Sequence, residues 1–154
     1  MSTAGTRSST GRSGADVPRG ASHELLAHTA EVRLRVRAPD FPALAAEAGR
    51  ALAALELGAD PLPATGAARE IALHAGDQGA LLVDWLNELI YLAETERWVA
   101  SEFAPRAGGA LELRMRVRGT LVDVAPSRVK AATHHGLEVR ATADGVEAEV
   151  VFDV

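Results

Sequence analysis

Strict alternation of apolar and charged residues is the feature that most limits how this chain can fold. Between Glu31 and Arg37 every second residue is apolar, and the residues between them are charged. The same alternation returns at 111–118 and, with one interruption, at 146–153. Successive side chains of a β-strand point to opposite faces. Each segment therefore predicts a strand with one apolar face, which another part of the chain must cover.

Two segments with helical periodicity can supply that cover. The first follows Asp40 and ends at Gly58, and the second follows Asp77 and covers about residues 79–95. Aspartate is a favoured N-cap residue, and glycine is favoured just after a helix ends. The apolar stripe of the second segment consists of Leu82, Trp85, Leu86, Leu89 and Ala93, and its opposite side carries Asp84, Asn87, Glu88 and Tyr91.

The order of these segments predicts an α+β domain. We expect strands at 22–37, 69–75, 98–103, 111–117, 129–140 and 146–153, with a tight hairpin at Asp144-Gly145. The order β-α-β-α-β-β-β-β favours two layers, with two amphipathic helices packed on a largely antiparallel or mixed sheet. The domain covers residues 21–154, and residues 1–20, rich in Ser, Gly and Arg, are predicted to form a disordered tail.

Composition excludes several classes of protein. The chain has no cysteine, so disulfides and thiolate metal sites are excluded. No apolar run is long enough to span a membrane, and the N-terminus lacks a signal-peptide core, so a cytoplasmic protein is expected. The net charge of −5 argues against general nucleic-acid binding. The alternative of a basic N-terminal arm that touches RNA would work against this charge.

The densest group of chemically useful residues lies at the start of the first strand. His28, Thr29 and Glu31 precede its apolar run, and the chain ends in Asp153 and Val154. If the last strand stays in the sheet to its end, the Glu31, Asp153 and terminal carboxylates could converge. Such a cluster is repulsive unless it holds a cation, and all-oxygen ligation suits Ca²⁺, Mg²⁺ or Mn²⁺. The alternative is a solvated strand end without a ligand.

Other polar groups have simpler explanations. Lys130 could hold an anion or a partner's carboxylate, or it could be a solvated side chain, and His134 and His135 point to opposite strand faces. Asp84 and Glu88 share a helix face, which favours a solvated surface over an acid–base pair. Seven arginines on outward strand faces could bind RNA, but interleaving with acidic side chains is favoured. They are Arg33, Arg35, Arg37, Arg114, Arg116, Arg118 and Arg140.

Four short segments together give a resemblance to a known family. They are His28-Thr29-Ala30-Glu31-Val32, Trp85-Leu86-Asn87-Glu88-Leu89-Ile90, Val129-Lys130-Ala131-Ala132-Thr133-His134-His135 and the terminal Phe152-Asp153-Val154. In order and approximate spacing they resemble the archease family, and the match covers about residues 22–154.

The resemblance implies an accessory protein and not an enzyme. Archeases assist the RtcB-type RNA-splicing ligase, which joins tRNA halves using GTP and a metal ion, and they promote its guanylylation and repeated turnover. By position, the resemblance implies a divalent cation, with Ca²⁺ favoured, held by Glu31, Asp153 and Val154. It also implies that Lys130 and His28 contact the partner.

One departure affects the metal prediction. The family usually has aspartate where this chain has Glu31, which lengthens the reach by one methylene. A flexible ion such as Ca²⁺ tolerates this better than Mg²⁺ does. A chaperone-like binding module and a metal-dependent hydrolase using Glu31 and Asp153 remain alternatives.

Overall fold

The computed structural model describes residues 20–27, 31–58 and 63–154. Within these ranges the chain forms two helices and eight strands. Their bounds are β1 (Ser22–Ala27), β2 (Glu31–Ala38), α1 (Phe41–Leu57), β3 (Thr65–His74), α2 (Gln78–Glu96), β4 (Trp98–Arg106), β5 (Glu112–Leu121), β6 (Ala131–Thr133), β7 (Val139–Thr142) and β8 (Gly145–Asp153).

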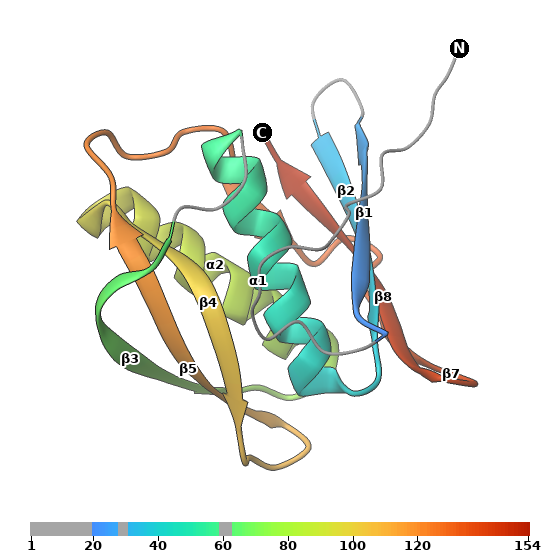
Figure 1. Cartoon of the computed structure of the whole chain (residues 1–154). Helices are drawn as coiled ribbons and strands as arrows, with labels where there is room; N and C mark the ends of the chain where they lie inside the picture. The colour runs from blue at the N-terminus through green and yellow to red at the C-terminus, as the bar shows by residue number, and fades with distance from the viewer. Residues whose placement is uncertain (1–19, 28–30, 59–62) are drawn as a thin grey trace.

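The strands form two antiparallel sheets. The larger sheet has the order β1-β2-β8-β6, with β7 also paired to β8, and the smaller has the order β3-β5-β4. Helix α1 contacts strands of both sheets, and the helix pair lies between them (Figure 1). The α+β class and the two helices are confirmed, while the strands, expected in a single sheet, are divided into two.

Both helices begin where the sequence predicts. The Asp40 carboxylate accepts a hydrogen bond from the Ala43 N–H (3.0 Å), and the Asp77 carboxylate accepts one from the Ala80 N–H (2.8 Å). Gly58 ends α1 in the left-handed conformation, with φ 68°, which glycine adopts without steric cost. Helix α2 ends differently, because Arg97 occupies the left-handed position, with φ 55°.

A single core joins the helices to both sheets. The predicted stripe of α2 is buried throughout, and the apolar sides of β2, β5 and β8 face the same core. Trp85 packs edge-on against Phe103 of β4, and its indole N–H donates to the Ala45 carbonyl of α1 (2.9 Å). Trp85 therefore ties the two helices to the smaller sheet.

Two predicted strands are each divided in the structure. The segment 22–37, expected as one strand with a lead-in, forms the hairpin of β1 and β2. The segment 129–140, expected as one long strand, is interrupted by a turn in which Gly136 has φ 66°. His134 and His135 therefore follow β6 and are not part of it, so the prediction of their strand faces is wrong.

Residues 1–19 lie outside the described residues, so the tail stays a prediction. Over the described ranges, neither helix is long and apolar enough to cross a bilayer.

Trp85→Ala should lower the free energy of unfolding by about 3–5 kcal/mol, because it empties a fully buried aromatic site. The matched control is Tyr91→Ala on the exposed side of the same helix, which should change stability by less than about 0.5 kcal/mol. Urea titration of both variants measures the difference. Equal losses would contradict this account of the core.

Candidate functional site

Glu31 and Asp153 are direct neighbours at one end of the larger sheet. Glu31 begins β2, Asp153 ends β8, and the register pairs their Cα atoms. Opposite residues of an antiparallel pair place their side chains on the same face. On the other side of Asp153 the register pairs Ala131, the first residue of β6. The two carboxylates thus stand in one row, which ends at the small side chain of Ala131.

Lys130 is held beside this row by the backbone. Its N–H donates to the Asp153 carbonyl (2.8 Å), and its side chain is exposed. Val154 follows Asp153 and is partly exposed. The structure therefore brings Glu31, Asp153, Val154 and Lys130 to the same end of the sheet. His28, the remaining predicted site residue, lies outside the described residues.

The donor set suits a hard divalent cation only in part. Two carboxylates on one face offer oxygen atoms of the kind that a hard cation binds, and Asp153 is open to solvent. Glu31, however, also lies 3.3 Å from the Arg33 guanidinium, which competes for its charge. Over the described residues, no three His, Cys, Asp or Glu side chains are grouped to hold a metal. Because Ca²⁺ takes roughly six to eight oxygen ligands, backbone oxygens and water would have to supply the rest.

Asn87 connects helix α2 to this end of the sheet. Its side-chain amide donates to the Ala132 carbonyl (3.0 Å), and its side-chain oxygen accepts from the Ala132 N–H (2.8 Å). β6 is only three residues long and directly follows Lys130, so these two bonds help to hold the chain next to Lys130 in position. In the sequence Asn87 lies on the polar side of the helix, and no local pattern predicts this contact.

A buried ionic group holds the β1–β2 hairpin against α1. The Glu47 carboxylate lies 2.7 Å from Nδ1 of His23 on β1 and accepts a hydrogen bond from Arg50 Nε (3.1 Å). Burial by itself raises the pKa of Glu47, but the His23 hydrogen bond and the Arg50 charge outweigh it and hold the pKa below the ordinary 4.5. This group fixes the hairpin whose second strand begins with Glu31.

Glu56 is a second buried acid, near the end of α1. Its residue is 6% exposed, and burial raises its pKa to about 8. Glu56 is therefore mostly protonated at neutral pH. The sequence held a signal for this burial, because Glu56 follows Leu52 by four residues on the apolar side of the helix.

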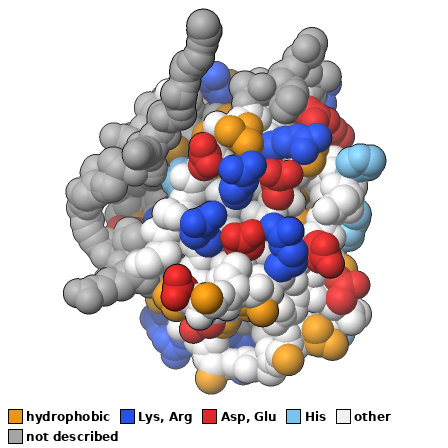
Figure 2. All heavy atoms as spheres, turned by 90° about the vertical axis from the view of Figure 1, so that its right-hand side faces the viewer, with side chains coloured by type: hydrophobic (Ala, Val, Ile, Leu, Met, Phe, Trp, Pro, Cys, Tyr) orange, Lys and Arg blue, Asp and Glu red, His pale blue; other side chains and the backbone are white. Residues whose placement is uncertain are grey.

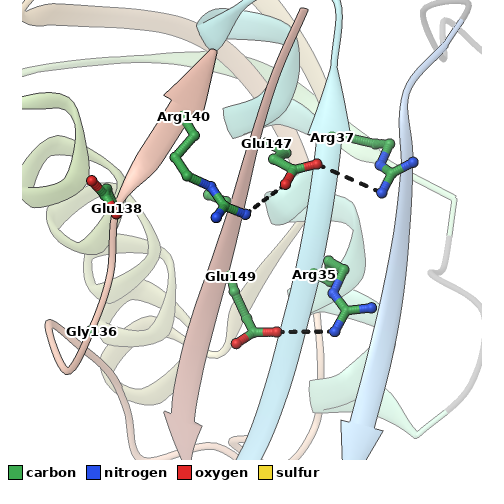
Figure 3. A pocket seen from close by; sticks show the side chains of 8 residues that line it. Arg35, Arg37, Gly136, Glu138, Arg140, Glu147 and Glu149 are labelled. Atoms are coloured by element: carbon green, nitrogen blue, oxygen red, sulfur yellow. Dashed lines mark hydrogen bonds and ion pairs between the residues drawn. The ribbon is translucent and has the colours of Figure 1, made fainter. Parts of the chain in front are cut away.

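The arginines of the larger sheet are interleaved with acids, as predicted. Figure 2 shows this face, with Lys/Arg and Asp/Glu side chains intermixed. Glu149 lies 3.3 Å from both Arg33 and Arg35, and Glu147 lies between Arg37 (3.6 Å) and Arg140 (2.6 Å). A hollow of about 400 Å³ lies on this face, and its charged lining consists of Arg35, Arg37, Arg140, Glu138, Glu147 and Glu149 (Figure 3). Because its charges are matched, the hollow is not a candidate site for an anion.

The other three arginines lie on the smaller sheet. Arg114, Arg116 and Arg118 all project from β5. Each is within 4 Å of an acid, with Glu112, Glu70 and Glu102 at 3.7, 3.9 and 3.3 Å. The seven arginines therefore do not form one basic patch.

Fold and site define a class: a small α+β domain with paired carboxylates at the end of its larger sheet. Residues 23–154 match the model of the archease protein family (MTH1598/TM1083). "Protein archease" of Methanosarcina barkeri is 33% identical over 144 residues, 88% of this chain and 97% of that protein. The Methanosarcina acetivorans relative is 32% identical over the same shares. The chain belongs to the archease family.

Solved structures agree with the fold. The solution structure of Methanobacterium thermoautotrophicum protein 1598 has a TM-score of 0.65 at 22% identity, covering 86% of this chain and 98% of its own. The crystal structure of "an archease, possible chaperone" from Thermotoga maritima has a TM-score of 0.56 at 21% identity, covering 84% and 94%. At these identities the likeness supports the fold alone.

Asn87→Ala should lower the free energy of unfolding by about 1–3 kcal/mol, because it leaves the N–H and C=O of buried Ala132 without partners. Asp84→Ala, one turn earlier on the exposed side of α2, is the control and should have an effect below about 0.5 kcal/mol. Urea titration compares them. If both variants matched the wild type, the Asn87 contact would have no role in holding β6.

Glu56→Gln should stabilise the protein at pH 8 and progressively less toward pH 4.5. The folded state binds the Glu56 proton more tightly, so the unfolded state ionises first above pH 4.5, and stability falls until about pH 8. Glutamine removes this loss because it does not ionise. Urea titrations at pH 5 and pH 8, with exposed Glu94→Gln as control, measure the effect. An advantage of equal size at both pH values would contradict it.

Proposed function

We propose that this protein is a non-catalytic activator of an RtcB-type RNA-splicing ligase. Its partner joins tRNA halves, and the protein promotes guanylylation and repeated turnover of that enzyme through a divalent cation held at the sheet end. Membership of the archease family supports the choice of partner. The observation that carries the proposal is the pairing of Glu31 with Asp153, with Lys130 hydrogen-bonded beside them.

The ligand set of the proposal is Glu31, Asp153 and an oxygen of Val154. Ca²⁺ is the favoured ion, because the longer Glu31 side chain and the incomplete set of protein ligands suit flexible coordination that includes water. When bound, the cation would offset the repulsion between the two carboxylates and present a positive charge at this surface. Lys130 would add a second cation for a carboxylate or phosphate of the partner.

A chaperone-like binding module is the second candidate function. It is favoured by the description of the Thermotoga maritima structure, at 21% identity, as a "possible chaperone". The two candidates differ in an observable way. A chaperone would raise the yield of folded ligase, whereas an activator would raise the rate of ligase that is already folded.

A divalent cation should raise the melting temperature of the wild-type protein, since it binds only the folded state. A hundredfold excess over the dissociation constant would add about 2.7 kcal/mol of stability. Glu31→Gln and Asp153→Asn should each abolish the rise. Asp144→Asn, at the β7–β8 turn, is the control that should retain it. Thermal unfolding with Ca²⁺, Mg²⁺ and Mn²⁺ tests this, and an unchanged melting temperature in all three ions would contradict the metal proposal.

The ligase assay tests the partner. Purified ligase should be guanylylated faster with the wild-type protein than without it, and Lys130→Ala should reduce that gain while leaving the melting temperature unchanged, because its side chain is exposed. Glu31→Gln and Asp153→Asn should reduce it too. A Lys130→Ala variant that activates the ligase normally would contradict this contact and show that Lys130 is a solvated side chain.

A further inference from the structure

The segment from Leu121 to Lys130 crosses the end of the molecule at which both helices finish. In Figure 1 it is the orange loop that leads from β5 across the upper ends of the helices toward the C-terminus. Four contacts fix it. At α2, the Arg97 carbonyl accepts from the Val122 N–H (2.8 Å), and the Arg97 guanidinium donates to the Asp123 carbonyl (2.9 Å).

The other two contacts lie further along the segment. The Arg128 guanidinium lies against Gly58, the end of α1, so closely that an added Cβ would be 2.8 Å from it. The Lys130 N–H donates to the Asp153 carbonyl (2.8 Å). The segment is therefore an ordered strap that leads directly to the Glu31–Asp153 row.

The strap presents two apolar side chains to solvent. Val124 is 78% exposed and Leu121 is 70% exposed, the highest fractions among the large apolar side chains of the described residues. Val122, between them, packs inward against the cluster of Ala53, Ala93 and Val99. Isolated exposed apolar residues are ordinary, but the backbone between these two is held by the partly buried Val122 and by the hydrogen bonds of Arg97 to Val122 and Asp123.

Arg97 pays a conformational cost to hold the strap. Among the described residues it is the one non-glycine residue with a positive φ, where glycine would be unstrained. Glycine could end the helix there but could not supply the guanidinium that binds Asp123. Arginine thus ends the helix less favourably than glycine would, but it fixes the strap. Apolar groups that are ordered before binding lose less entropy when a partner covers them.

We propose that Leu121 and Val124 form a docking surface for an apolar pocket of the protein partner, which under the function proposed above is the ligase. The inference rests on that function and adds the surface that anchors it. A protein partner is favoured over RNA because the strap offers aliphatic side chains and no aromatic ring for base stacking. Its charged residues before Lys130, Asp123 and Arg128, balance each other and suit the polar rim of a protein interface. From these side chains the strap runs on to Lys130, whose N–H bonds the Asp153 carbonyl.

The test compares two ends of one strand. Leu121→Ser with Val124→Ser removes the docking side chains, and Leu111→Ser is the matched control, an exposed leucine directly before the first residue of β5. Calorimetric titration of full-length protein into ligase should give a dissociation constant about tenfold or more higher for the double variant, the loss expected when two buried aliphatic groups are removed. The control should bind as the wild type does, and all three melting temperatures should agree.

The outcomes separate this inference from the function on which it rests. If the wild type activates the ligase and the double variant binds it with unchanged affinity, the docking surface is wrong while the proposed function stands. If the wild type neither binds nor activates the ligase, both fail. If sedimentation shows a wild-type dimer that the double variant dissociates, the surface joins copies of this chain, which also overturns the inference.

Discussion

The pairing of β2 with β8 is the interaction on which the rest of the structure depends. β8 is the last strand in sequence, yet it lies inside the larger sheet and pairs with β2, β6 and β7. The register sets Val32 opposite Phe152 and Leu34 opposite Val150 on the core side. Because side chains alternate between faces, a slip of one residue would turn these apolar groups outward and the arginines inward. Burial of the core side therefore also fixes the position of Glu31 beside Asp153.

Three further interactions hold the elements that meet at this end of the sheet. The His23–Glu47–Arg50 group holds the β1–β2 hairpin on α1, and Asn87 holds β6 on α2. The strap from Leu121 to Lys130 joins the ends of both helices to the same edge. Elements far apart in sequence thus hold the two carboxylates and Lys130 in position. Repulsion between Glu31 and Asp153 is tolerated because the core, and not the site, determines the register.

The sequence was informative where local rules decide the structure. Asp40, Asp77 and Gly58 mark helix ends, and the alternation in β2, β5 and β8 gives the buried faces correctly. The proximity of Glu31 and Asp153 followed from one premise, that a strand apolar to its last residue stays in the sheet.

What the sequence did not predict depends on contacts between distant elements. Asn87 looks solvated on a helical wheel, and its role depends on β6 passing alongside α2. Glu47 and Glu56 are charged residues on a helix whose two sides are both covered, because sheets lie on both sides of the helix pair. The division of 129–140 into two strands depends on a turn at Gly136. In the sequence this glycine looks like the many glycines that a continuous strand tolerates.

The most direct measurement is paramagnetic broadening of backbone amide signals by Mn²⁺ in ¹⁵N-labelled protein. If the sheet end holds the cation, substoichiometric Mn²⁺ should broaden the amides of Val32, Ala131 and Phe152 first and leave those of the β4–β5 turn near Gly109 sharp. Glu31→Gln should remove the selective broadening. Broadening centred elsewhere, or spread evenly over the acidic surface, would contradict a divalent-cation site formed by Glu31 and Asp153.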